Sequence, residues 1–262
     1  MNITLGFIGY GNMGRAVAQG LLGTGLLVPS RLLVHDPAAT PPAGAHVAGS
    51  AEEVLREADV ILLAVKPQVF AEAGAAWAEL AAGLSGKIVI SVMAGIRTDR
   101  LRAAFPGFTV IRVMPNLGLS VGQGATAIAM DGVPADSLDL AEVIFRSSGT
   151  IVRVTEDRMD AVTAVSGSGP MYLFEFVGAM TEAGVKAGLA RETAYALAVQ
   201  TTKGSLKLLE TSTDTPEAWT KRVCSPGGTT LAALGVLQRE GFHGILERAV
   251  AAAKKRSEEL SA

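Results

Sequence analysis

Short apolar runs alternate with helical patterns over the first 155 residues of the chain. Several of these runs are rich in Val, Ile and Leu without polar alternation, which is typical of strands buried on both faces of a parallel sheet. Strands are therefore predicted at residues 3–8, 31–35, 60–65, 87–92, 110–114, 125–130 and 150–154. Helices are predicted between them at residues 15–22, 51–57, 70–80 and 135–147. This alternation predicts a doubly wound α/β sheet.

The pattern changes near residue 155, after which only helical spacing is found. Helices are predicted at residues 157–165, 170–187, 192–210, 228–240 and 243–260, with no strand among them. The polar stretch at residues 211–216 is expected to be a loop. The chain is thus expected to have an α/β domain at residues 1–154 and an all-helical domain at residues 155–262.

The composition excludes several classes of protein. Hydrophobic residues make up 49% of the 262 residues and charged residues 18%, which is not the composition of a disordered chain. The net charge is −2, with 23 basic and 25 acidic residues, so there is no electrostatic footprint for nucleic acid. No apolar run approaches the roughly 20 residues of a membrane span, and no basic leader precedes the first strand. We therefore expect a soluble, cytoplasmic protein without nucleic-acid or membrane partners.

Cysteine and histidine are too sparse to suggest a disulfide or metal framework. Cys224 is the only cysteine, which excludes an internal disulfide and a thiolate cluster. The three histidines, His35, His46 and His243, are far apart in the sequence and form no H-x-x-x-H pair. No metal site is therefore expected.

A glycine-rich turn, Gly9-Tyr10-Gly11-Asn12-Met13-Gly14, follows the first predicted strand and precedes the first predicted helix. In this context the G-x-G-x-x-G pattern is typical of a dinucleotide-binding loop. Gly9 would form the tight turn, Gly11 would let the backbone approach a pyrophosphate, and Gly14 would let helix and strand pack closely. The alternative is a glycine-rich turn without a ligand. The predicted cofactor-binding residues here are Ile8, Gly9, Gly11, Asn12, Met13 and Gly14.

Asp36 ends the second predicted strand, about 20 residues after the glycine loop, where a carboxylate bonds the ribose hydroxyls of NAD. A carboxylate would repel the 2′-phosphate of NADP, and the next arginine after Arg31 is Arg56, 20 residues beyond Asp36, so no arginine is near in the sequence to bind that phosphate. Taken alone, Asp36 therefore favours NAD. The alternative is that Asp36 only opens a turn before Pro37.

Five segments together resemble the pyrroline-5-carboxylate reductase family, and the resemblance runs from residue 5 to residue 260. The segments are GYGNMG at residues 9–14, AVKPQ at 64–68, RVMPN at 112–116, AVSGSGP at 164–170 and SPGGTT at 225–230. Each segment alone is a weak signal, but all five in this order are a strong one.

The resemblance implies a fold and a reaction. The fold is an N-terminal Rossmann-type domain followed by an all-helical C-terminal domain that forms a homodimer, often assembled into a ring of dimers. The reaction is hydride transfer from NADPH or NADH to the imine carbon of 1-pyrroline-5-carboxylate, which yields L-proline. In such a reaction the cofactor carries the chemistry, and the protein binds and orients both molecules.

The resemblance also implies roles for individual residues. Thr230 would be the catalytic hydroxyl donor to the imine. The substrate would contact Ser225, Gly227, Gly228, Thr229, Ser166 and Ser168, although Ser225 or Thr229 could instead only cap the next helix. The cofactor would also contact Ala64, Val65, Lys66, Pro67, Ala94, Gly95 and Asn116, although Asn116 could instead fix a turn and Lys66 could be a solvated charge.

Three departures from the family pattern leave alternatives open. Leu117-Gly118 replaces the usual Thr-Pro, Ala51 replaces an asparagine that contacts adenosine, and Asp36-Pro37 replaces a segment that suits NADP. The last two favour NAD or use of both cofactors. The first leaves room for another cyclic imine as substrate. A β-hydroxyacid dehydrogenase is disfavoured by the late position of Lys186, and a non-catalytic nucleotide sensor is disfavoured by the hydroxyls of Thr229 and Thr230.

Overall fold

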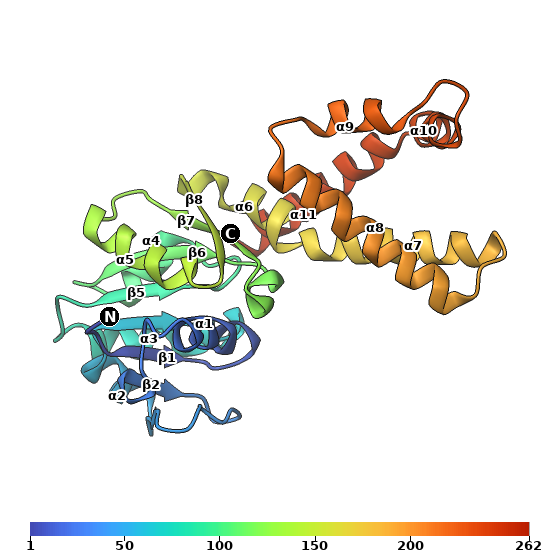
Figure 1. The fold of residues 1–262 in the computed structure, drawn as a ribbon. Coiled ribbons are helices and arrows are strands. Elements are labelled where there is room, and N and C mark those ends of the chain that lie inside the picture. The colour runs from blue at the N-terminus through green and yellow to red at the C-terminus, as the bar shows by residue number, and fades with distance from the viewer. Residues whose placement is uncertain (262) are drawn as a thin grey trace. The chain divides into compact units, whose positions relative to one another are not determined.

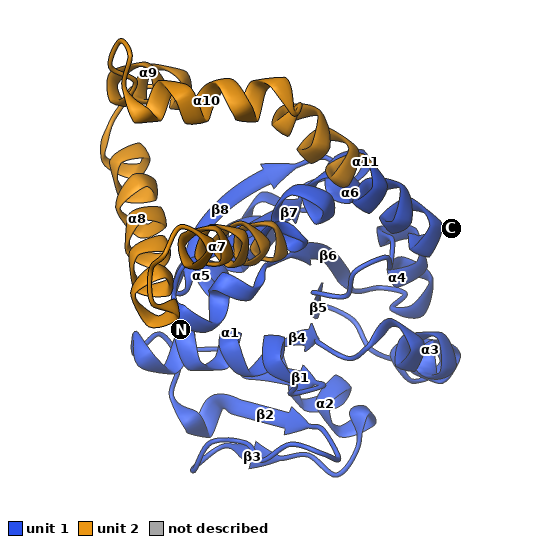
Figure 2. Cartoon of the chain, turned by 90° about the vertical axis from the view of Figure 1, so that its right-hand side faces the viewer, with its two compact units in different colours: residues 1–169, 252–262 blue, residues 170–251 orange. Residues whose placement is uncertain are grey.

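The computed structural model describes residues 1–261 of the chain and divides them into two compact units (Figure 2). Unit 1 comprises Met1–Gly169 together with the chain from Ala252 onward. Unit 2 is the segment Pro170–Ala251. This division differs from the expected one at 154/155, because residues 155–169 and the end of the last helix pack with the sheet. The division into an α/β domain at residues 1–154 and a helical domain at residues 155–262 stays a proposal.

Unit 1 is built on an eight-stranded sheet with the strand order β3-β2-β1-β4-β5-β6-β7-β8. In Figure 1 the labelled strands follow one another from β2 and β1 through β5 and β6 to β7 and β8. The strands are β1 (Leu5–Ile8), β2 (Leu32–His35), β3 (His46–Val47), β4 (Val60–Leu63), β5 (Ile88–Ser91), β6 (Thr109–Met114), β7 (Gly124–Ala129) and β8 (Gly149–Val154). Leu5 pairs with Leu32 on one side and with Val60 on the other, so β1 lies between β2 and β4. All neighbouring strands are parallel except β6 and β7.

Helices cover both faces of this sheet. The helices of unit 1 are α1 (Asn12–Gly23), α2 (Ala51–Glu57), α3 (Pro67–Ala81), α4 (Thr98–Ala104), α5 (Ala135–Arg146) and α6 (Met159–Val162). Phe7 of β1 and Leu62 of β4 pack in one buried cluster with residues of α1 and α5. The neighbouring residues, Ile8 and Leu63, pack in a second cluster with residues of α2, α3 and α4. Alternate residues of one strand thus enter two cores, which confirms the doubly wound prediction.

Unit 2 is entirely helical in the described residues. It holds most of α7 (Gly169–Lys186), then α8 (Arg191–Thr211), α9 (Pro216–Val223), α10 (Thr229–Arg239) and the first half of α11 (Phe242–Ser261). Helices α7 and α8 approach each other through small residues, since a Cβ built on Gly184 would lie 3.0 Å from the Cβ of Ala194.

Several local expectations need correction. The helix predicted at residues 157–165 is instead a 3₁₀ turn (η3, Glu156–Arg158), the short helix α6 and a π-helical turn (η4, Thr163–Gly167). The sequence analysis did not predict strand β3 or helices α4 and α9, which have two, seven and eight residues. The pair β6–β7 is antiparallel because the connection between them, residues 115–123, is too short for a crossover helix.

Over residues 1–261, no helix combines the length and the apolar character needed to cross a lipid bilayer.

Candidate cofactor and substrate sites

The three glycines of the dinucleotide loop have three different surroundings. Gly9 has a φ of +91°, and a Cβ built there would lie 2.7 Å from the backbone of Ala64 and Val65. A Cβ on Gly14 would lie 2.8 Å from the carbonyl oxygen of Gly9. A Cβ on Gly11 would meet no atom within 4 Å. The protein therefore fills the space at Gly9 and Gly14, and leaves it open only at Gly11.

Helix α1 begins directly at this open position. Its N-cap is Gly11, which makes no side-chain cap hydrogen bond, and no acidic residue lies in its first turn. The free amides and the partial positive charge of this helix end suit a phosphate group. The loop thus fits a dinucleotide pyrophosphate at Gly11.

The side chain of Tyr10, a residue of the glycine loop, packs into the hydrophobic core of unit 1. It is buried, and its ring meets the ring of Phe7 edge to face, with the centroids 5.5 Å apart. Burial raises the pKa of the Tyr10 hydroxyl, so this side chain stays neutral under the loop.

Asp36 uses both carboxylate oxygens to bind backbone amides. Its Oδ2 accepts a hydrogen bond of 2.6 Å from the Tyr10 N–H, and its Oδ1 accepts one of 2.8 Å from the Ala38 N–H. The second bond is the turn that was the alternative interpretation of this residue. The first bond ties the end of β2 to the glycine loop. The role of Asp36 toward a ribose stays a prediction.

The other predicted cofactor residues of unit 1 follow the carboxyl ends of neighbouring parallel strands. Ala64, Val65 and Lys66 follow β4, and α3 begins at Pro67. Ala94 and Gly95 form a turn after β5, where Gly95 has a φ of +75°. With Ile8–Gly14 after β1 and Asp36 after β2, these residues share one edge of the sheet, where open α/β folds bind ligands.

Asn116 fixes the loop that follows β6. Its Oδ1 accepts hydrogen bonds from the amides of Gly118 (3.2 Å) and Ala125 (3.1 Å). Its Nδ2 donates to Ser166 Oγ at 3.3 Å. The turn interpretation of Asn116 therefore describes its contacts in this structure, and these contacts also bring Ser166 to the same loop.

Ser166 and Ser168 lie at the end of a π-helical turn, η4. The Ser168 amide donates to the Thr163 carbonyl at 2.8 Å. π-Helical turns inside helices are frequent at functional sites. Sequence reasoning missed this turn, because a single extra residue in a helix leaves no periodic signal.

The segment Ser225–Gly228 of unit 2 connects α9 to α10. Gly227 has a φ of +70°, and the Gly228 amide donates to the Ser225 carbonyl at 3.0 Å. Helix α10 begins at Thr229 with Gly228 as its N-cap and no side-chain cap hydrogen bond. The alternative in which Ser225 or Thr229 caps this helix is therefore not what the structure contains. The first-turn amides have no side-chain cap.

Thr230 lines a cavity of about 870 Å³ within unit 2. Its polar lining also includes Glu217, Lys221, Gln238 and His243. The cavity thus combines a hydroxyl, an amide, a carboxylate and two basic groups with an apolar lining. It is large enough for a small cyclic amino acid.

One cluster outside these sites contains possible metal ligands. His46, Glu53 and Glu57 place one ligand atom each within 4.8 Å of one another. The sequence did not reveal it, because His46 and the two glutamates come from different elements, β3 and α2. The His46 Nε2 already lies 2.7 Å from Glu53, whose other oxygen accepts from the Gly49 amide. The His46 side chain is 59% exposed, and nothing in the cluster points to a bound ion.

Comparisons with known proteins agree with this arrangement. A family model described as NADP oxidoreductase, coenzyme F420-dependent, matches residues 4–95, and one described as pyrroline-5-carboxylate reductase dimerisation matches residues 156–260. A pyrroline-5-carboxylate reductase from Synechocystis sp. is 39% identical over 99% of both chains.

Two solved structures are similar over the whole chain. Plasmodium falciparum pyrroline carboxylate reductase with NADP bound has a TM-score of 0.89 and 32% identity, covering 100% of this chain and 99% of that one. A pyrroline-5-carboxylate reductase from Coxiella burnetii has a TM-score of 0.91 and 33% identity, covering 100% of both chains. On this full-length similarity, the chain belongs to the pyrroline-5-carboxylate reductase family.

Proposed function

We propose that this protein reduces 1-pyrroline-5-carboxylate to L-proline with NADPH or NADH, the last step of proline biosynthesis. The observation that carries the proposal is the open position at Gly11, in a dinucleotide loop whose other two glycines are closely packed. This loop belongs to a chain that is 39% identical, along 99% of its length, to a pyrroline-5-carboxylate reductase.

A bound nicotinamide cofactor supplies the hydride that reduces the imine carbon. The amides at the start of α1 would hold its pyrophosphate at Gly11. The segments Ala64–Pro67 and Ala94–Gly95 would lie along it, because they follow the next two strands at the same edge of the sheet. Asn116, at the end of β6, would shape the last part of this edge through its bonds to Gly118 and Ala125.

The substrate would be held by the start of α10. Its uncapped first-turn amides and the Thr229 hydroxyl suit a carboxylate. Thr230 would donate its hydroxyl hydrogen bond to the imine nitrogen, which makes the imine carbon a better hydride acceptor. The carbon gains the hydride from the cofactor and the nitrogen gains a proton that comes from solvent, so the ring becomes a secondary amine. Ser166 and Ser168 would complete the substrate contacts.

The residues near the adenosine position favour NAD, or use of both cofactors. Asp36 is held in place by two backbone amides, so its negative charge stays at the end of β2. That charge opposes a 2′-phosphate. The relative from Plasmodium falciparum was solved with NADP bound. The ratio of the rates with NADH and NADPH measures the preference of this chain.

We also propose a cytoplasmic homodimer, with a ring of dimers as a further assembly. Large apolar side chains stay exposed on α7 and α8 when the chain is alone. They include Phe174, Tyr195 and Leu197, which are 64%, 58% and 55% exposed. Soluble monomers rarely expose apolar surface on this scale. A second copy of the helical domain, residues 155–262, would cover it.

The test follows cofactor oxidation at neutral pH with 1-pyrroline-5-carboxylate, with NADH and NADPH measured side by side. A larger cyclic imine serves as a second substrate, because the Leu117-Gly118 loop differs from the family pattern. Cofactor binding is measured separately by fluorescence. Rapid turnover of 1-pyrroline-5-carboxylate is expected. Cofactor binding with turnover only of the larger imine would overturn the assigned substrate.

A further inference from the structure

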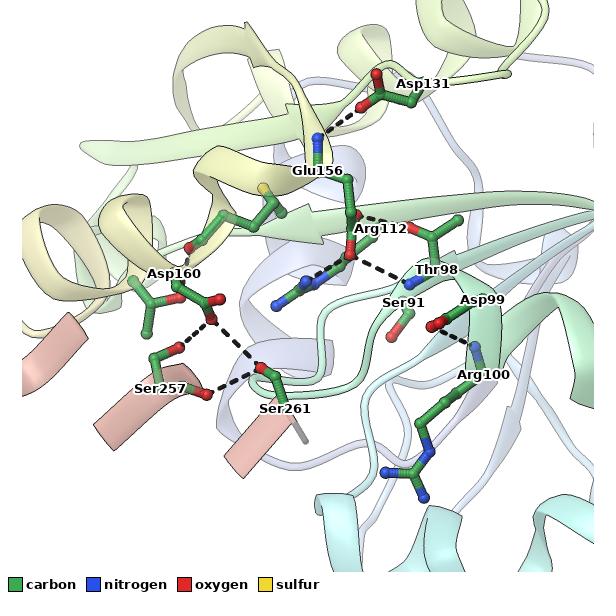
Figure 3. Close-up of polar contacts among 12 residues, drawn as sticks. Ser91, Thr98, Asp99, Arg100, Arg112, Asp131, Glu156, Asp160, Ser257 and Ser261 are labelled. Carbon is green, nitrogen blue, oxygen red and sulfur yellow. Dashed lines mark hydrogen bonds and ion pairs between the residues drawn. The ribbon is translucent and has the colours of Figure 1, made fainter. Parts of the chain in front are cut away.

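A turn at residues 93–98 follows β5. It lies outside helices and strands up to its last residue, Thr98, where α4 begins. Under the proposed function, on which this inference rests, Ala94 and Gly95 of this turn contact the cofactor. Met93 donates its amide to Ser91 Oγ at 3.3 Å, which closes the first part of the turn. The rest of the turn is held by side chains from elsewhere in unit 1 (Figure 3).

Glu156 holds the far end of the turn. Its Oε1 accepts from the Thr98 amide at 3.2 Å, and its Oε2 accepts from the Thr98 hydroxyl at 2.7 Å. The Glu156 amide donates to the Asp131 carboxylate at 2.5 Å, which fixes the backbone that carries the side chain. Both carboxylate oxygens of Glu156 are thus directed at the first residue of α4.

Arg112 holds Glu156 in turn. Its Nη1 lies 2.7 Å from Glu156 Oε1, and the Arg112 side chain is only 2% exposed on β6. Among residues 1–261, the buried Nη2 of Arg112 has no hydrogen-bond partner. Glu156 therefore balances the buried positive charge of Arg112. Separating the two side chains would leave the Arg112 charge buried without a partner.

Asp160, one helical turn after Glu156, anchors the end of the chain. Its Oδ1 accepts from Ser257 Oγ at 2.6 Å and from Ser261 Oγ at 3.3 Å, and all three residues are buried. Leu260, between these two serines, lies over the turn. A Cβ built on Gly95 would lie 3.1 Å from the Leu260 carbonyl oxygen and 3.2 Å from its Cβ.

We propose that Glu156 and Asp160 are positioning residues for cofactor binding. Glu156 fixes the turn at Thr98, and Asp160 fixes the last helix that covers the turn at Gly95. Neither is among the residues proposed to contact substrate or cofactor. They hold residues 93–98 in one shape before the cofactor arrives, so the cofactor does not have to order the turn when it binds.

The contacts of Glu156 with Thr98 and of Asp160 with Ser257 and Ser261 are called the clamp. The test uses mild variants at Thr98 and at Ser257. Thr98→Val removes one hydroxyl and keeps the shape of the side chain, and Thr98→Ser restores the hydroxyl. Ser257→Ala removes the shorter bond to Asp160. Glu142→Gln is the control. Like Glu156, Glu142 is a carboxylate of unit 1 that binds arginine, in its case Arg146 and Arg153. It has no contact with the clamp.

Cofactor Kd by fluorescence, cofactor KM, kcat at saturating cofactor and Tm are measured for each variant. Thr98→Val is expected to raise the Kd and KM for the cofactor about tenfold, with kcat within about twofold of wild type. Ser257→Ala is expected to shift the same two quantities in the same direction. Thr98→Ser and Glu142→Gln are expected to bind the cofactor like wild type.

Two results would overturn the clamp. One is a lower Tm in Thr98→Val and Ser257→Ala with unchanged cofactor Kd, which is the pattern of a purely structural role. The other is no rescue by Thr98→Ser. A failure of the proposed function looks different, because wild type itself would then bind cofactor without reducing 1-pyrroline-5-carboxylate, while the Kd pattern of the variants would persist. Wild type that binds neither cofactor would overturn both.

Discussion

The same added methyl group should affect stability at one glycine of the dinucleotide loop and cofactor binding at another. At Gly9 it would meet the backbone of Ala64 and Val65 at 2.7 Å, at a φ of +91°. At Gly11 it would meet no protein atom within 4 Å, at an ordinary φ of −71°. Gly9→Ala should therefore damage mainly the folded protein, whereas Gly11→Ala should damage mainly the binding of the cofactor.

The structure sets the size of each effect. The backbone conformation at Gly9 costs a residue with a side chain about 1–3 kcal/mol. Relief of the overlap adds about 1–3 kcal/mol. For a chain of this size, a sum of about 2–6 kcal/mol lowers Tm by roughly 5–20 °C. Gly11→Ala changes only an N-cap, which costs about 1 kcal/mol or less.

Two measurements separate the variants. Tm without cofactor, at one fixed protein concentration, should fall clearly for Gly9→Ala and by only a few degrees for Gly11→Ala. The KM for NADPH and NADH should rise at least about tenfold for Gly11→Ala, which corresponds to about 1.4 kcal/mol of lost binding. Gly11→Ala with wild-type cofactor affinity would refute the placement of the pyrophosphate. Gly9→Ala with wild-type Tm would refute the packing argument.

Three further predictions address the hydroxyl donor, the cofactor preference and the response to acid. Thr230→Val should lower kcat about a hundredfold with unchanged cofactor Kd, and a near-wild-type kcat would remove Thr230 from the mechanism. Asp36→Asn should raise the ratio of kcat/KM for NADPH over NADH about tenfold, and an unchanged ratio would show that Asp36 only forms the turn. The Arg153 guanidinium, and then that of Arg146, hold the pKa of Glu142 below its ordinary value. The carboxylate therefore contributes stability, about 1 kcal/mol or less, above the unfolded pKa, and this stability is lost as pH falls through the folded pKa. The Tm gap between wild type and Glu142→Gln should be present at pH 7, should narrow as pH falls below the ordinary glutamate pKa of about 4.3, and should close once pH is below the folded pKa; a gap that does not narrow in acid would contradict this assignment.

The sequence predicted the α/β fold because the strands of its core are short, apolar runs with glycine at the loop. Ile8, Gly9 and Gly11 were placed correctly at and just after the end of β1, and Gly14 lies in the first turn of α1, because this motif has a fixed spacing relative to strand and helix. The edge positions Ala64 and Gly95 came from the family resemblance, and both follow parallel strands at the edge of the sheet where open α/β folds bind ligands.

The remaining features depend on contacts between distant residues, which periodicity does not record. The bonds of Asp36 to the glycine loop and of Asn116 to Ser166 join residues 26 and 50 positions apart. The bond of Glu156 to Thr98 spans 58 positions. Helix α4 has seven residues and no side-chain cap, so it leaves no periodic signal of its own. These features need the folded chain before they can be recognised.

The bond from the Gly118 amide to Asn116 restricts how this loop can evolve. Where the family pattern has proline, this chain has a glycine whose N–H is used, and a Cβ there would lie 2.4 Å from the Gln123 carbonyl oxygen. Proline has no N–H to donate and would also disfavour the helical backbone of Leu117. A single change of Gly118 to the family-pattern proline should thus break the loop. The contacts couple residues 116–118, so the family-pattern residues at this loop should be introduced together rather than one at a time.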